Sequence, residues 1–91
     1  MPRLNAGDLT TALGRLPGWT ATNNEITKTF VFGNFVEALA FVNRVGDLAE
    51  AAGHHPDIDI RYNRVIIALT THDDGGVTDK DTALAEGIEQ A

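Results

Sequence analysis

Three histidines, His54, His55 and His72, are the residues of this chain best suited to chemistry near neutral pH. An imidazole has an unperturbed pKa of about 6.5, so it takes up and releases protons easily in that range. One histidine can therefore act as a base while a neighbour acts as an acid. The chain has no cysteine, which excludes a thiol nucleophile, a thiolate metal site and a disulfide framework.

Acidic residues accompany the histidines in the sequence and could orient or charge their rings. Glu50 precedes His54 by four residues, the distance of one helical turn, and is the candidate partner of that ring. The acids that follow His72, and are its candidate partners, are Asp73, Asp74 and Asp81.

A metal site is one alternative for the same residues, because histidines beside an acid can bind zinc or non-haem iron. Adjacent residues of an extended segment, however, point to opposite sides, which hinders His54 and His55 from holding one ion. The other alternative is that the histidines are solvated surface residues, the commonest role of a single loop histidine.

A predicted hairpin brings the histidines together. Residues 57–62 and 65–71 alternate between polar and apolar side chains, which predicts two strands joined by a turn at Asn63 and Arg64. The core face of the second strand would hold Val65, Ile67 and Leu69.

The register of this hairpin decides which residues meet at its open end. With a turn at Asn63 and Arg64, His55 lies opposite His72, and Ile58 lies opposite Leu69. A shift of two residues would place Gly53 opposite His72. Both registers bring the histidines to the same end, because paired strands are only about 5 Å apart.

The other elements follow from periodicity and capping residues. We expect helices over 8–16, 35–52 and from Thr78 onward, and strands over 19–22 and 25–32. Asn34 and Thr78 have capping-box spacing to the acids that follow them, and Gly53 suits a left-handed helix end. The stripe expected to be apolar on the long helix is Phe35, Leu39, Val42, Gly46 and Ala49, beside Val36, Ala40, Val45 and Leu48. In the last helix it is Ala83, Leu84 and Ile88.

The element order is therefore α-β-β-α-β-β-α, in a single domain over residues 1–91. It predicts an α+β fold, a four-stranded antiparallel sheet with helices packed on one face. Trp19 is expected in the core, and Tyr62 is expected to pack near the hairpin tip.

The net charge of −6 is unevenly distributed. Residues 1–71 hold seven acidic and six basic side chains, whereas the last twenty residues hold six acids and only Lys80. Without a basic stripe, we expect neither nucleic acid nor an anionic membrane surface as a partner. No apolar run approaches ~18 residues, and the N-terminal region lacks the apolar core of a signal peptide. We therefore expect a cytoplasmic protein.

The spacing of these residues resembles the defining motif of the pterin-4a-carbinolamine dehydratases. The motif reads Glu50-x-x-x-His54-His55-Pro56, then Tyr62 after five residues, His72 after nine more and Asp81 after eight more. The run from Leu69 to Asp81 and the sequence Pro17-Gly18-Trp19 are also similar to that family, and the likeness covers essentially the whole chain.

The resemblance implies a lyase that dehydrates 4a-hydroxytetrahydropterin to quinonoid dihydropterin, without a metal or an organic cofactor. It implies that His54 and His72 form the acid–base pair, either one being the acid, and that His55 orients the pterin or assists proton transfer. The residues implied to line the pterin pocket are His54, His55, Pro56, Thr71, His72, Asp73 and Asp74. Those implied to support it are Glu50, Trp19 and Asp81.

The resemblance also implies partners. Members of the family are homodimers or homotetramers, and they act beside an aromatic amino acid hydroxylase, whose pterin they regenerate. Animal members also serve as dimerisation cofactors of a homeodomain transcription factor. A protein-interaction module on the same fold is therefore the alternative function from a different class.

Overall fold

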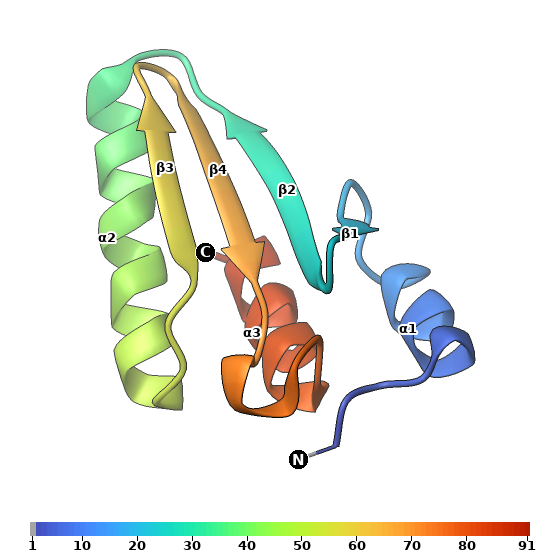
Figure 1. Cartoon of the computed structure of the whole chain (residues 1–91). Coiled ribbons are helices and arrows are strands. Elements are labelled where there is room, and N and C mark those ends of the chain that lie inside the picture. The colour runs from blue at the N-terminus through green and yellow to red at the C-terminus, as the bar shows by residue number, and fades with distance from the viewer. Residues whose placement is uncertain (1) are drawn as a thin grey trace.

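A computed structural model describes residues 2–91 of the chain and confirms the predicted α+β order (Figure 1). The elements are α1 (Ala6–Leu13), β1 (Thr20–Thr22), β2 (Glu25–Val31), α2 (Phe35–Ala52), β3 (Asp57–Arg61), β4 (Arg64–Leu69), the short 3-10 helix η1 (His72–Asp74) and α3 (Asp79–Glu89). No helix in this described part is both long and apolar enough to cross a bilayer.

The strands form one antiparallel sheet in the order β1-β2-β4-β3. The β1–β2 hairpin turns at Asn23 and Asn24, whose φ angles of 51° and 66° are left-handed, as the asparagine pair predicted. Helix α2 connects β2 to β3, and β4 fills the space between these two strands. The C-terminal end of α2 therefore lies at the same end of the sheet as the C-terminal end of β4 (Figure 1).

The β3–β4 hairpin turns at Tyr62 and Asn63, so the predicted turn at Asn63 and Arg64 is wrong. Ile58 pairs with Ile67, which is the register shifted by two residues. Asn63 explains the shift, because its Nδ2 donates to the Phe32 carbonyl at 3.0 Å and its own carbonyl accepts from Phe32 N at 2.8 Å. Tyr62 is consequently left in the turn with a φ of 52° and is 67% exposed, so it does not pack as expected.

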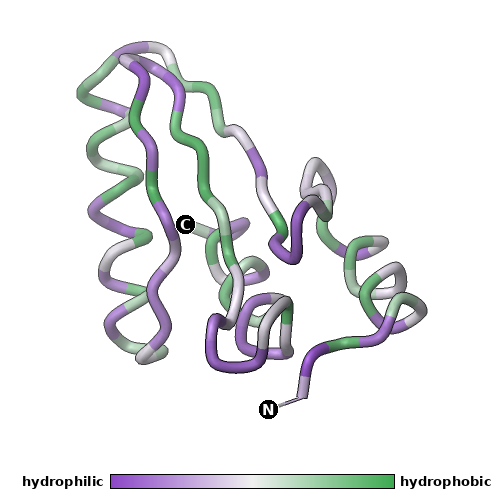
Figure 2. Tube along the Cα trace, in the orientation of Figure 1, coloured by the Kyte–Doolittle hydropathy of each residue, from purple (hydrophilic) through white to green (hydrophobic). Residues whose placement is uncertain are grey.

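The core lies between one face of the sheet and the helices. The sheet contributes Ile26, Val65, Ile67 and Leu69, all fully buried. The helices contribute Phe41, Val45, Ala49, Leu84, Ala85 and Ile88. Figure 2 shows the hydrophobic residues along β4, the central strand, and hydrophilic residues in the loop that follows it. Burial of the apolar face of β4 thus determines where the chain leaves the sheet and enters the loop that carries His72.

The side of helix α2 that faces the sheet is only partly the one predicted, since Val45 and Ala49 are buried and Val42 and Leu48 pack against the core as expected. Its buried residues are Ala38, Phe41, Val45 and Ala49, whereas Phe35, Val36 and Leu39 are exposed. Periodicity alone could not choose between the two sides, because both are apolar. Aromatic packing chooses, since the ring of Phe41 lies 4.7 Å from that of Phe30 and 5.0 Å from that of Phe32.

The outer helices also differ in detail from the prediction. Helix α1 begins at its Asn5 cap and ends at Leu13, before the predicted Leu16, which instead lies in the core. In α3 the capping box of Thr78 and Asp81 is confirmed. Ala83, predicted on the apolar stripe, is exposed, and Ala85 is buried in its place.

Candidate active site

The three histidines line one shallow depression of about 310 Å³, together with Gly53, Thr71, Asp73 and Lys80. The depression lies where three segments meet, namely the end of α2, the loop after β4 and the first turn of α3. The prediction that the fold brings the histidines together is therefore confirmed.

Gly53 creates the turn that delivers His54 and His55 to this place. Its φ of 63° and ψ of 30° are left-handed, a conformation that glycine adopts without steric cost. Its N–H donates to Glu50 O at 3.2 Å, and His54 N donates to Ala49 O at 3.1 Å. These two bonds form a Schellman-type helix end, which reverses the chain sharply and turns His54 toward α3.

The loop that carries His72 is closed on itself. Thr71 N donates to Gly76 O at 2.9 Å, and Gly76 N returns a bond to Thr71 O at 3.3 Å. Inside this closure, η1 presents His72 with an exposed side chain. The N-terminal segment braces the loop, since Arg3 Nη1 donates to Gly75 O at 3.2 Å.

His54 is the anchored histidine of the site. Its Nε2 lies 2.5 Å from Oδ1 of Asp81, and the two side chains are only 13% and 0% exposed. The other carboxylate oxygen, Oδ2, accepts from Thr71 Oγ1 and from Thr78 N, both at 2.8 Å. A buried carboxylate with both oxygens hydrogen-bonded holds its partner ring in one place.

His55 pairs instead with Glu50 through its own Nε2, and both side chains are largely exposed. Two of the predicted pairings are therefore wrong, because Glu50 pairs with His55 and not His54, and Asp81 pairs with His54 and not His72. The left-handed turn at Gly53 is the reason. It directs His54 toward α3. The next residue, His55, then lies beside the last turn of α2, where Glu50 is.

The remaining predicted site residues differ in whether they line the depression. Asp73 lines the depression, whereas half-buried Pro56 and Asp74 are not among its lining residues. Trp19 lies in the core, edge-on to Phe30 at 6.1 Å, and does not line it either. Sequence reasoning missed the contribution of Lys80 to the rim. Its position two residues after the Thr78 cap, on the first turn of α3, was the available signal.

The metal alternative can be compared with the geometry. Within residues 2–91, no three His, Asp or Glu side chains are grouped so that they could hold a metal ion. The rings of His54 and His55 are directed to separate carboxylates, as expected for adjacent residues of a turning segment.

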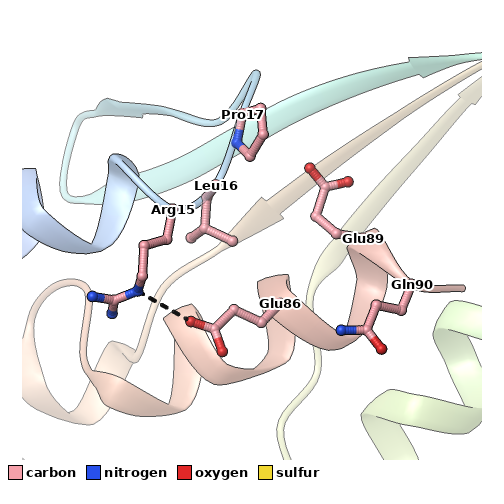
Figure 3. Close-up of a pocket in the computed structure, with 6 residues that line it drawn as sticks. All are labelled: Arg15, Leu16, Pro17, Glu86, Glu89 and Gln90. Carbon is pink, nitrogen blue, oxygen red and sulfur yellow. Dashed lines mark ion pairs between the residues drawn. The ribbon is translucent and has the colours of Figure 1, made fainter.

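A larger depression, of about 600 Å³, lies between the segment after α1 and the C-terminal half of α3 (Figure 3). Its charged groups are engaged with one another, since Arg15 Nε lies 3.8 Å from Glu86 Oε1. Glu89 accepts from Lys28 Nζ at 2.5 Å, and the same ammonium donates to Pro17 O at 2.8 Å. It contains none of the histidines, so the smaller depression is the better candidate for catalysis.

Comparison with known proteins identifies relatives of the whole chain. The model of the family described as pterin 4 alpha carbinolamine dehydratase matches residues 2–91. A relative from Chloroflexus aurantiacus, whose name classes it with the pterin-4-alpha-carbinolamine dehydratases, is 59% identical over 99% of this chain and 97% of its own. A similarly named protein from Thermomicrobium roseum is 51% identical over 99% of this chain and 97% of its own.

Solved structures give the same result at the level of the fold. A transcriptional coactivator/pterin dehydratase from Brucella melitensis superposes with a TM-score of 0.94 at 34% identity, over 97% of this chain and 96% of its own. A pterin dehydratase-like protein described as a RuBisCO assembly factor in the alpha-carboxysome superposes with a TM-score of 0.66 at 23% identity, over 79% of this chain and 83% of its own. The second likeness concerns the fold alone.

Proposed function

Because the chain belongs to the pterin 4 alpha carbinolamine dehydratase family, we propose that it is a hydro-lyase that converts 4a-hydroxytetrahydropterin to quinonoid dihydropterin. The observation that carries the proposal is the pairing of two imidazoles from different segments in one depression. His54 is anchored and nearly buried, and His72 is exposed on a closed loop.

The chemistry of the proposed reaction matches two imidazoles. One histidine gives a proton to the 4a-hydroxyl, the C4a–O bond breaks, and water leaves. The other histidine removes the proton from N5, and the electron pair of that N–H bond forms the C4a=N5 double bond. His54 and His72 are the proposed pair, and acid–base assistance of this kind typically contributes about 10² to 10⁴ in rate. The balance requires no oxidant, metal or organic cofactor.

Residues on the rim would orient the pterin. His55 and Asp73 both line the depression with exposed side chains that can reach a heterocycle from the solvent side. Pro56 and Asp74 flank them. We assign these residues to binding, and we assign Glu50 to support of His55 because the two side chains form an ion pair.

The test is a spectroscopic assay with synthetic 4a-hydroxytetrahydropterin in the presence of a chelator. The purified protein should accelerate dehydration, and His54→Ala and His72→Ala should each lower kcat by at least about tenfold. Asn43→Ala, an exposed position on α2, is the control and should keep the full rate. A wild-type rate equal to that of buffer would reject the enzyme in favour of an interaction module.

We also propose that the chain forms a homodimer or homotetramer. Phe35, Val36 and Leu39 are 44%, 75% and 41% exposed, and Val31 and Tyr62 are 66% and 67% exposed. Phe35, Val36 and Leu39 lie together in the first turns of α2, and contiguous exposed apolar surface marks a contact site. Light scattering after gel filtration should give two or four chain masses for the wild type. Val36→Asp should lower the mass, and an unchanged mass would place the contact elsewhere.

A further inference from the structure

A buried network beneath His54 extends beyond the histidine and its carboxylate. Thr71 and Thr78 are 6% and 0% exposed, and Asp81 is completely buried between them. Thr71 Oγ1 lies 2.8 Å from Thr78 Oγ1 and 2.8 Å from Asp81 Oδ2. Burying hydroxyls in a small core is costly unless each makes a specific bond, so this network needs an explanation.

The direction of the hydrogen bonds follows from the number of protons. Lys80 N, which can only donate, donates to Thr78 Oγ1 at 3.2 Å. Thr71 must donate its single proton to Asp81, because otherwise two lone pairs would face each other at 2.8 Å. Thr78 must then donate to Thr71. The chain of bonds therefore runs one way, from the first turn of α3 through both hydroxyls to the carboxylate.

The carboxylate that these bonds hold determines which nitrogen of His54 carries a proton. Oδ2 of Asp81 already accepts from Thr71 and from Thr78 N, so its other oxygen, Oδ1, is the acceptor for Nε2–H of His54. A neutral His54 is thereby held with its proton on Nε2 and a lone pair on Nδ1. His54 lines the depression and its side chain is 13% exposed, and among the described residues only its Nε2 is hydrogen-bonded, so Nδ1 is the nitrogen left for a ligand.

We propose that Thr71 and Thr78 are positioning residues whose hydroxyls fix the Asp81 carboxylate and, through it, present His54 with Nδ1 as the atom that exchanges protons with the pterin. The inference rests on the proposed function only in its last step, because the tautomer of His54 is a property of the protein alone. Thr71 also lines the depression, so the inference adds a positioning role to its place on the wall.

The test uses Thr71→Val, which keeps the shape of the side chain and removes its hydroxyl. Thr71→Ser keeps the hydroxyl and should restore what valine removes. The matched control is Thr82→Val, because Thr82 is 8% exposed on the same helix but its hydroxyl bonds to Asp79 O. If Thr71→Val does not fold, Thr71→Ala compared with Thr71→Ser gives the same contrast.

The first measurement is long-range proton–nitrogen correlation NMR on protein with nitrogen-15 histidine, which reports the tautomer without substrate. Wild type, Thr71→Ser and Thr82→Val should show the Nε2–H form of His54, and Thr71→Val should show a mixture of both tautomers. A pure Nε2–H form in Thr71→Val would overturn the proposal, even if the wild type dehydrates no pterin.

The second measurement is steady-state kinetics. Thr71→Val should lower kcat by about tenfold, the lower end of what second-layer substitutions cost, and change KM by less than about twofold. An unchanged kcat in Thr71→Val would overturn the positioning role. An equal loss in Thr82→Val would do so too, because it would mean that kcat responds to any change in the buried packing of α3.

Discussion

The two adjacent histidines form the same kind of pair in opposite surroundings. His54 and Asp81 are 13% and 0% exposed, and the carboxylate has two further donors. His55 and Glu50 are 64% and 77% exposed, and within residues 2–91 no further side-chain hydrogen bond holds either of them. A desolvated pair keeps one geometry and is costly to break, whereas an exposed pair is screened by water and contributes little.

One turn of the chain thereby places two adjacent imidazoles in opposite surroundings. The partner of His55 comes from its own helix end, five positions away, whereas the partner of His54 comes from another helix, 27 positions away. A fixed ring suits proton transfer, which needs a defined geometry. An exposed ring is accessible to a ligand on the rim. Each prediction below removes one part of this contrast.

Asp81→Asn should have the largest effect, because it replaces the anchor of His54 with an amide of the same shape. The amide can no longer accept from all three donors, so we expect a loss of about 3 kcal/mol in the free energy of unfolding. The rate should fall by about 10²-fold, since a wrongly protonated imidazole is presented. Denaturant titration and kinetics measure both. A variant with wild-type rate would show that the buried pair has no catalytic part.

His55→Ala should separate the two histidines by the kinetic parameter it changes. Removing the exposed ring should raise KM by about three- to tenfold and leave kcat within about threefold, because a rim contact contributes to binding in ground and transition states alike. The free energy of unfolding should stay within about 0.5 kcal/mol of wild type. If kcat falls as far as in His54→Ala, the assignment of binding to His55 and proton transfer to His54 is wrong.

Gly53→Ala tests the turn that separates the two rings. No atom lies within 4 Å of the added Cβ, so the cost comes only from the left-handed backbone at φ 63°. We expect about 1 kcal/mol of destabilisation, which lowers the Tm by about 4–8 °C in a domain of this size. Gly46→Ala, with equally open space inside α2 and no left-handed φ, is the control and should be neutral or stabilising. Equal effects in both variants would remove the special role of the turn.

Glu50→Gln should have the smallest effect. Its pair with His55 is exposed, so the free energy of unfolding should change by less than about 0.5 kcal/mol and the rate by less than about twofold. Asp59→Asn is the control, since Asp59 pairs with Arg61 at a similar exposure on β3. That hydrogen-bonded carboxylate raises the pKa of Arg61, which is charged at any working pH, so its removal adds no pH dependence. If Glu50→Gln lowered the free energy of unfolding and the rate as much as Asp81→Asn, the exposed pair and the buried pair would contribute equally.

Local sequence signals were sufficient to predict the order of the main helices and strands and the convergence of the histidines at one end of the hairpin. The caps at Asn34, Gly53 and Thr78 are confirmed because each is decided by a few neighbouring residues. The alternation of β4 likewise identified its buried face. Convergence of the histidines depended only on the hairpin, and both registers gave it.

Tertiary contacts decided what the sequence left open. The turn at Tyr62 follows from the bonds between Asn63 and Phe32, which are distant in sequence. The side of α2 that faces the sheet follows from the packing of Phe41. The partner of His54 could not be predicted from spacing, because Glu50 is nearer in sequence and only the direction of the turn at Gly53 makes Asp81 nearer in space.

The two lysines of the chain differ as nucleophiles toward chemical reagents. The ammonium of Lys28 is engaged by Pro17 O and Glu89 and lies 4.8 Å from the centre of the Phe30 ring. Lys80 is exposed on the rim of the histidine depression. A limiting dose of an acylating reagent should therefore modify Lys80 before Lys28, and mass spectrometry of the modified peptide becomes a footprint of that rim. Coupling the protein to a sensor surface through its lysines would, for the same reason, block the depression it is meant to report on.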